Sequence, residues 1–205
     1  MLHAFSIKNY CSIKQTKLEF SFKDGKAPSG YQELEEWIFL ETGQKTRLVP
    51  CLAMYGANAS GKSNIIKALK NFKQIVLLGL EECLFAPFAP NKIIPSGDNT
   101  SFELSFFRNS KHFIYQIVFN NFKIVSEALK VNDHTIFSLN EEKEDFSGLA
   151  QEKYNTIERL HEIRKVECIV NSKQIKTFLS RISTQSSGLN DNVFQAVNEI
   201  NDIEI

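Results

Sequence analysis

The chain has 205 residues, of which 42 % are hydrophobic, and its 24 basic and 24 acidic side chains cancel to a formal net charge of zero. This balance gives no long-range attraction to nucleic acid or anionic lipid, and no stretch reaches the roughly 18 apolar residues of a membrane span. The four cysteines lie far apart without metal-ligand spacing, which argues against a zinc site and a disulfide framework. The composition therefore predicts a soluble cytoplasmic protein that does not enter a membrane.

The first elements that the sequence predicts are two short strands. Apolar and polar residues alternate in "HAFSIKNY" (3–10) and in "TKLEFSF" (16–22), as in strands with one buried face. The continuous apolar run "RLVPCLAMY" (47–55) ends next to a glycine, which is typical of a buried central strand, and Pro50 marks where that strand would begin. Apolar residues at helical spacing follow between 62 and 80 and predict an amphipathic helix.

From residue 101 the pattern changes to successive short β-like runs. "SFELSFF", "HFIYQIVF", "FKIVSEALKV" and "HTIFSL" are separated by "RNSK", "NN" and "ND", and the last two are hairpin-turn dipeptides. These runs predict an antiparallel meander. Residues 150–203 predict helices, and "FLSRISTQ" (178–185) is interpreted either as a strand or as the end of a helix.

The most specific motif is "GANASGKS" at residues 56–63, which fits G-x-x-x-x-G-K-[ST] at every fixed position. Glycines let the backbone turn tightly, so that successive amide groups point inward at an anion. Lys62 carries a positive charge to the β and γ phosphates, and Ser63 offers its hydroxyl to Mg²⁺. The helix that follows directs its positive end at the phosphates. The motif therefore predicts a phosphate-binding loop.

The nucleotide expected in this loop is ATP. GTPases usually recognise guanine with an Asn-Lys-x-Asp stretch, and the nearest sequence here, "NKII" from Asn91, lacks the aspartate. The candidate residues that bind the nucleotide are Gly56, Ala57, Asn58, Ala59, Ser60, Gly61, Lys62, Ser63 and Asn64.

Hydrolysis at such a loop also needs an acidic residue at the end of a second apolar strand, which orders Mg²⁺. "IVLLGLEE" ends in Glu81 and Glu82, but it continues the predicted helix rather than returning to a sheet. "FKIVSE" ends in Glu127, but its alternation places it in the meander. The sequence therefore predicts that the second acid is not in this chain.

Taken together, "FSIKNYCSIKQTKLEFS" and "MYGANASGKSNIIKAL" resemble the N-terminal part of the AAA15-type ABC-like ATPases. These are relatives of the SMC, RecF and OLD-type ATPase heads, and many occur in bacterial anti-phage systems. Residues 100–131 look like the β insertion of that family, in which Tyr115 and Glu127 match recurring positions. "TFLSRISTQ" looks like its segment near the Q-loop. The resemblance covers most of the chain, but only the first 70 residues carry specific motifs.

The resemblance implies ATP and Mg²⁺ as cofactors, with Lys62 and Gln185 as catalytic residues and Ser63 and Gln185 as metal ligands. The alternative for Gln185 is a solvent-facing glutamine before a serine turn. Lys8, Asn9, Tyr10 and Ser12 would lie near the base and ribose, although Tyr10 also fits as an aromatic residue at a strand end. Relatives often have a basic residue where this chain has Cys11.

The predicted fold class is α/β, similar to an ABC-ATPase head of the P-loop NTPases. We expect a mixed sheet, an antiparallel β meander and a helical C-terminal segment, with the head incomplete. The expected divisions are 1–100 for the nucleotide-binding lobe, 101–140 for the β insertion and 141–205 for the helical segment.

Three functions remain open at this point. The first is an ATPase that is completed by a protein partner or a missing C-terminal half, with a homodimer of heads enclosing the ATP. The second is a nucleotide switch that binds ATP and barely hydrolyses it. The third is an interaction module whose loop is vestigial. In each case nucleic acid would be contacted only through a partner, and no membrane would be involved.

Overall fold

The computed structural model describes residues 1–22, 29–31, 36–39, 42–81, 83, 89–92, 99–150, 156–170, 172–184 and 191–204. Its largest feature is a seven-stranded sheet with the order β2-β1-β5-β6-β7-β8-β9, in which all pairings are antiparallel. Two small sheets pair β3 with β4 and β10 with β11. The strands are β1 (Leu2–Tyr10), β2 (Ile13–Glu19), β3 (Glu36–Ile38), β4 (Lys45–Arg47), β5 (Thr100–Arg108), β6 (Lys111–Phe119), β7 (Ile124–Val131), β8 (His134–Leu139), β9 (Glu144–Asp145), β10 (Ile169–Val170) and β11 (Lys173–Gln174).

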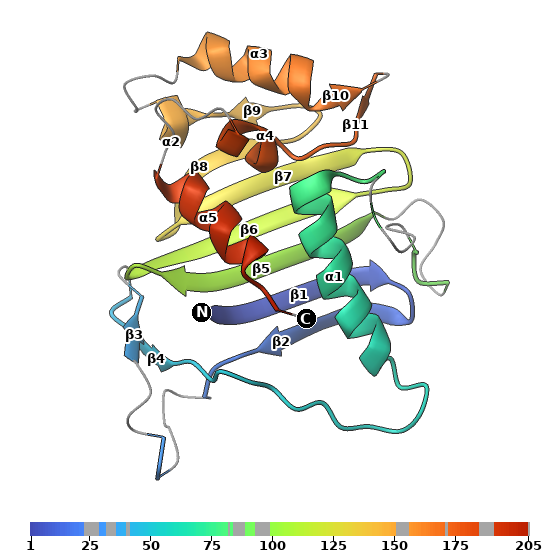
Figure 1. Cartoon of the computed structure of the whole chain (residues 1–205), viewed down its shortest axis with the longest axis vertical. Coiled ribbons are helices and arrows are strands. Elements are labelled where there is room, and N and C mark those ends of the chain that lie inside the picture. Colours follow the sequence, from blue (N-terminus) through green and yellow to red (C-terminus); the bar gives the residue numbers. More distant parts are fainter. Residues whose placement is uncertain are drawn as a thin grey trace.

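The helices cover one face of the large sheet. Figure 1 shows α1, α4 and α5 in front of the strands, with α3 beside the small β10–β11 hairpin. The helices in the described part of the chain are α1 (Lys62–Leu78), α2 (Ser147–Ala150), α3 (Ile157–Glu167), α4 (Phe178–Thr184) and α5 (Asp191–Asn201).

The core lies between α1 and the covered face of the sheet. Phe102 on β5 and Tyr115 on β6 are fully buried on that face. Phe72 of α1 packs over both, with its ring centroid 6.4 Å from that of Phe102 and 5.9 Å from that of Tyr115. Burying a side chain of this size contributes about 1.5–3 kcal/mol. These aromatic contacts therefore hold the helix that follows the glycine-rich loop in a fixed place on the sheet.

The α/β class predicted from the sequence is confirmed, and the runs between 101 and 140 form the antiparallel meander β5–β8. The meander does not stand apart from the N-terminal strands, because β5 pairs with β1 in the same sheet. The expected parallel contribution to a mixed sheet is not formed by the described strands. Of the two interpretations of "FLSRISTQ", the helical one holds as far as Thr184, and the short β10–β11 hairpin lies within the region 150–203, for which mainly helices were expected.

The prediction that 47–55 is a buried central strand is wrong. In this run, backbone pairing with the segment after β2 extends only as far as Val49. Leu48 forms an isolated β-bridge with Ser21, and the Val49 amide donates to the Phe20 carbonyl at 2.9 Å. Residues 50–55 belong to no ladder of the described strands, and the Tyr55 side chain is 92 % exposed. A central strand needs a partner on each side. Both sides of β1 are already taken by β2 and β5, so this run finds no place beside it.

The helix after the loop is shorter than its apolar pattern suggests. The pattern extends to residue 80, but α1 ends at Leu78 because Gly79 adopts a φ of 103°. A Cβ atom at Gly79 would lie 2.9 Å from the Ile175 carbonyl oxygen, so only glycine permits this close approach. Glu81 therefore lies beyond the helix in a turn. Within the described ranges, no helix is long and apolar enough to cross a membrane.

Candidate phosphate-binding site

The loop at residues 56–61 curls tightly between the exposed segment 50–55 and α1. Ala59 and Gly61 adopt left-handed φ values of 63° and 96°. A Cβ atom at Gly56 would lie 2.9 Å from the Ser60 Oγ, so a side chain at this position would force the Ser60 hydroxyl to move. The sequence pattern thus produces a narrow concave turn of the kind that directs backbone amides at an anion.

Lys62 lies across the inside of this turn. Its Nζ donates hydrogen bonds to the carbonyl oxygens of Gly56 and Ala57, both at 2.7 Å, and to the Ser60 Oγ at 3.2 Å. These partners are neutral oxygens, so they do not cancel the charge of the ammonium group. A phosphate group that enters the turn would meet this charge directly.

The N-terminus of α1 adds a second source of positive potential. Its N-cap residue is Gly61, no side chain caps it, and the first turn contains no acidic residue. The first amide groups of a helix have no partner within the helix and carry a partial positive charge. Ser63 is exposed in this first turn, where its hydroxyl can reach a ligand. The loop and the helix end together form a site for a polyanion.

The turn between β1 and β2 contacts the same helix end. Asn64 Nδ2 donates to the Ser12 Oγ at 2.9 Å, and a Cβ atom at Gly61 would lie 3.1 Å from that oxygen. Further along α1, Asn71 Nδ2 donates to the Tyr10 hydroxyl at 2.8 Å. The N-terminal hairpin therefore fixes the helix at two points.

Asn9 and Tyr10, for which a place near the base and ribose was expected, are both buried, and Tyr10 thus fits its alternative as an aromatic residue at a strand end. Each is only 1 % exposed. Asn9 has a left-handed φ of 55°, and its Oδ1 accepts a hydrogen bond from the Asn91 amide at 2.7 Å. The Cys11 amide donates to the Ala89 carbonyl at 2.5 Å. These residues hold the segment 89–92 against the hairpin, which is a structural role, whereas Ser12 is exposed beside the loop.

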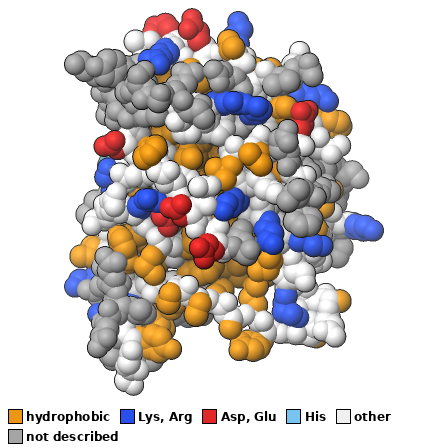
Figure 2. Space-filling model, in the orientation of Figure 1, with side chains coloured by type: hydrophobic (Ala, Val, Ile, Leu, Met, Phe, Trp, Pro, Cys, Tyr) orange, Lys and Arg blue, Asp and Glu red, His pale blue; other side chains and the backbone are white. Residues whose placement is uncertain are grey.

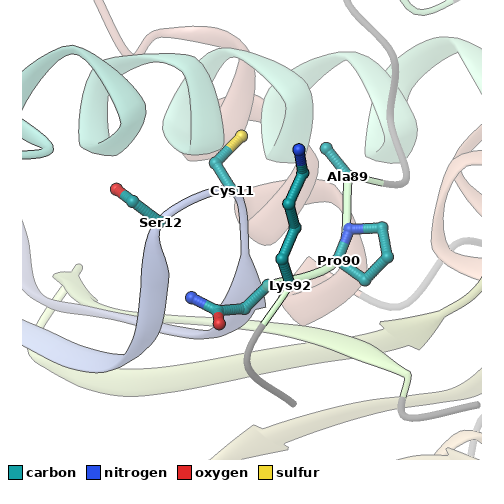
Figure 3. Close-up of a pocket in the computed structure, with 6 residues that line it drawn as sticks. Cys11, Ser12, Ala89, Pro90 and Lys92 are labelled. Carbon is teal, nitrogen blue, oxygen red and sulfur yellow. The ribbon is translucent and has the colours of Figure 1, made fainter. Parts of the chain in front are cut away.

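A pocket of about 700 Å³ opens between the β1–β2 turn and the segment 89–92. Figure 3 shows the side chains of Cys11 and Lys92 pointing toward α1. In this view Lys92 lies between Cys11 on one side and Ala89 and Pro90 on the other. Ser12 belongs both to this pocket and to the contact with Asn64, so the pocket adjoins the phosphate-binding loop. The described lining residues are Cys11, Ser12, Ala89, Pro90, Asn91 and Lys92.

The candidate acids are not placed to bind a metal at the loop. Glu81 follows the C-terminal end of α1, and a helix of 17 residues separates the two ends by about 25 Å. Glu127 is 1 % exposed and accepts hydrogen bonds from the Tyr115 hydroxyl and from the amides of Phe178 and Leu179. Burial raises the pKa of Glu127 to about 6, and the bonds from these three donors oppose the rise. Glu82 lies outside the described residues.

Gln185, the other predicted catalytic and metal-binding residue, also lies outside the described residues. The helix that precedes it, α4, is anchored at its start by Glu127. Thr177, just before α4, donates through its Oγ1 to the Val76 carbonyl of α1 at 2.8 Å. This link between α1 and α4 could not be inferred from the sequence, because Thr177 and Val76 are 101 residues apart.

Comparison with known protein families gives a match over the phosphate-binding loop and the meander. A family model described as "AAA domain, putative AbiEii toxin, Type IV TA system" matches residues 51–165, which is more than half of the chain. The matched range contains the phosphate-binding loop, α1 and the whole meander. Among curated proteins, none matches the chain. The chain therefore belongs to this AAA-domain family of P-loop ATPases.

Proposed function

We propose that the chain is the ATP-binding lobe of an ABC-like ATPase of the AAA15 type, within its AAA-domain family. The observation that carries the proposal is the loop at 56–61, which curls round the Lys62 ammonium at the uncapped start of α1. A nucleoside triphosphate suits this arrangement because its phosphate chain spans both the loop amides and the positive end of the helix.

Each residue of the motif has a proposed role toward the nucleotide and Mg²⁺. Lys62 would exchange its carbonyl partners for the β and γ phosphates, and the exposed Ser63 hydroxyl would hold Mg²⁺. When bound, Mg²⁺ neutralises charge on the phosphate oxygens. Gln185 stays a proposed second metal ligand and catalytic residue. The phosphate-contacting set is Gly56, Ala57, Asn58, Ala59, Ser60, Gly61, Lys62, Ser63 and Asn64.

Hydrolysis would depend on a further polypeptide segment, a C-terminal half or a separate partner. The described acids that the sequence offers as candidates, Glu81 and Glu127, are held away from the loop. The catalytic acid of this proposal would therefore come from that further segment.

The exposed segment before the loop supports this dependence. Residues 50–55 include Leu52, which is 42 % exposed, and Tyr55, which is 92 % exposed. Figure 2 shows hydrophobic side chains along the lower edge of the face, where Figure 1 traces the chain that leads into α1. An extended apolar segment without a ladder partner is ready to pair with an added strand. A completing segment would bury it and bring the acid to the Mg²⁺ site.

The partner that we propose beyond this segment is a second copy of the head, which would enclose ATP between two phosphate loops. A role in anti-phage defence belongs to the same proposal. It rests on the resemblance to the AAA15 type and on the toxin–antitoxin description of the matching family, which is an associational argument.

A second candidate function is a nucleotide switch that binds ATP and controls a partner without hydrolysing it. The observation that favours it is the same distance between the loop and the candidate acids. An interaction module with a vestigial loop is less well supported, since Lys62 and Ser63 are both present and Lys62 lies in the loop.

Phosphate release by the purified chain, with ATP and Mg²⁺, tests the proposal. We expect ATP to bind and the chain alone to release no phosphate above the level of its Lys62→Ala variant. Sustained release that the variant loses would show that a catalytic acid lies within these residues. Release that begins only when a completing polypeptide is added would separate the ATPase from the switch.

A further inference from the structure

The outward face of the helical layer carries opposite charges side by side. α1 contains four lysines and no acidic residue, and Lys67 and Lys70, here called the basic pair, lie on its side away from the sheet. The chain that follows α5 is acidic, and Asp202 and Glu204, here called the acidic pair, are both exposed. Figure 2 shows acidic side chains near the middle of this face and basic ones beside them, where Figure 1 places α1.

A hydrogen bond fixes the acidic pair next to α1. Lys73 of α1 donates through its Nζ to the Ile203 carbonyl at 2.9 Å, and Ile203 lies between the two acids in the sequence. Within the described ranges, neither lysine of the basic pair forms an ion pair. In the acidic pair, Asp202 has one cationic neighbour, Arg108 at 3.5 Å, and is still 65 % exposed. The charges of this face are therefore available to a second molecule.

Exposed apolar side chains accompany these charges. Ile66 and Leu78 on α1 are 38 % and 52 % exposed, and Phe194 on α5 is 54 % exposed. Single exposed apolar residues are common on any surface, but these three share one face with the two charged pairs. Exposed ion pairs contribute little affinity on their own, whereas apolar anchors contribute much of it. The face thus combines anchors with charges that can fix the register of a partner.

A second copy of the chain suits this face because the face is complementary to itself. In a symmetric dimer, a two-fold axis brings the same patch of each copy together. An axis that lies in the interface and runs between the basic and acidic pairs places the basic pair of each copy opposite the acidic pair of the other. A face with one sign of charge could not pair with itself in this way, since like charges would meet.

We propose that this helical face pairs with the same face of a second copy, through contacts that need no nucleotide. The pairing differs from the enclosure of ATP between two heads, because it uses the outer side of α1 and the end of α5 rather than the phosphate-binding loop. The inference therefore does not rest on the proposed function. A chain that bound no ATP would still form this pair.

Charge reversal tests the pairing through its symmetry. Lys67→Glu with Lys70→Glu makes both parts of the face acidic, and Asp202→Lys with Glu204→Lys makes both parts basic. Sedimentation equilibrium of the full chain, at low ionic strength and without nucleotide, measures the dissociation constant of the dimer. We expect each double variant alone to raise this constant about tenfold or more. An equimolar mixture of the two should return to within about threefold of wild type, because opposite charges then meet at both contacts.

A matched control reverses two lysines on the other face of the sheet. Lys8 and Lys130 are exposed, and the alternation of their strands places them opposite the face that bears Phe102 and Tyr115. Lys8→Glu with Lys130→Glu should leave the dissociation constant within about twofold of wild type. Circular dichroism checks that every variant is folded. The wild-type dimer should also weaken as salt is added, since salt screens exposed charges.

Three results would overturn the inference. A wild-type chain that stays monomeric at every concentration lacks the interface. Double variants that dimerise like wild type, or a mixture that does not recover, would place the contact on another surface. Dimerisation that appears only with ATP–Mg²⁺ would assign the association to the nucleotide-bound heads, and the proposed function would then stand without this face. Recovery by the mixture in a chain that binds no ATP would instead leave this inference standing and overturn the proposed function.

Discussion

The Tyr115 hydroxyl on β6 donates a hydrogen bond of 2.9 Å to the carboxylate of Glu127 on β7, inside the core. The same carboxylate accepts the amides of Phe178 and Leu179, which begin α4. A buried carboxylate is tolerated when hydrogen bonds replace its lost hydration. This pair therefore joins the meander to the helical part of the chain, where α4 in turn contacts the end of α1.

Replacing Glu127 by Gln should destabilise the fold. The amide keeps one oxygen, but its NH₂ group would face a backbone amide that also donates. We expect a loss of about 2–4 kcal/mol in the free energy of unfolding at pH 8, measured by urea denaturation. Tyr115→Phe removes one donor and leaves the other two, so it should cost only about 1–2 kcal/mol. Equal costs for both variants would contradict this interpretation of the network.

Lowering the pH should weaken the fold through His112. His112 is 7 % exposed, and its Nε2 lies 2.7 Å from the Ser105 Oγ. Burial, with a smaller contribution from His3, lowers the pKa of His112 to about 4. The unfolded chain would take up a proton near pH 6.5 while the folded chain does not, so stability falls as the pH drops from about 6.5 to about 4. We expect a loss of about 2–3 kcal/mol from this group.

The variant His112→Gln isolates this effect from other groups, including Glu127. Burial raises the pKa of Glu127 above that of an ordinary glutamate, so its ionisation destabilises the fold as the pH rises toward 6. The difference in unfolding free energy between wild type and His112→Gln should therefore shrink as the pH falls from 6.5 to 4.5. A constant difference would show that His112 does not titrate in this way.

Asn9 should stabilise the fold through both its backbone and its side chain. Asn9→Gly keeps the left-handed backbone but removes the hydrogen bond from the Asn91 amide, at a cost of about 1–2 kcal/mol. Asn9→Ala also brings the left-handed strain of about 1–2 kcal/mol. Thermal unfolding should rank wild type above Asn9→Gly and Asn9→Ala last. A glycine variant less stable than the alanine variant would refute the role of the backbone.

Gly61→Ala should damage nucleotide binding more than folding. Gly61 has a φ of 96°, and a Cβ atom there would lie 3.1 Å from the Ser12 Oγ. Gly43 has a φ of 65°, and a Cβ atom there would meet nothing within 4 Å. Gly43→Ala is therefore a control that introduces the backbone strain of a left-handed alanine without a steric contact. We expect both to lose about 1–2 kcal/mol of stability and only Gly61→Ala to lose tenfold or more in ATP affinity. Unchanged affinity in Gly61→Ala would contradict the tight contact of loop and turn.

The features that the sequence predicted correctly are those set by local patterns. The helix α1, the strands of the meander and the turns between them follow from the spacing of apolar residues and from turn residues. The phosphate-binding loop follows from its glycines, and the structure shows its tight turn at Ala59 and Gly61.

The features that were missed depend on contacts between distant residues. Strand β1 is paired with β2 on one side and with β5 on the other, so residues 50–55 cannot pair with it and join no ladder of the described sheet. The Asn91–Asn9 hydrogen bond joins two residues that are 82 positions apart in the sequence, and no local sequence pattern predicts it. Asn9 was expected near the base and ribose because it belongs to a motif, and Tyr10 was considered both there and as an aromatic residue at a strand end; the buried contacts of both show that a motif residue can serve the fold.

The most direct test of the nucleotide site is calorimetric titration of the purified chain with ATP–Mg²⁺, beside Lys62→Ala. Lys62 is hydrogen-bonded to oxygens of the loop and lies at its surface, so its replacement should leave the thermal unfolding nearly unchanged. We expect the wild type to bind and the variant to bind at least tenfold more weakly, since a charged contact to phosphate is lost. Equal affinity in both, or no binding by a folded wild type, would contradict the assignment of residues 56–63 as the nucleotide site.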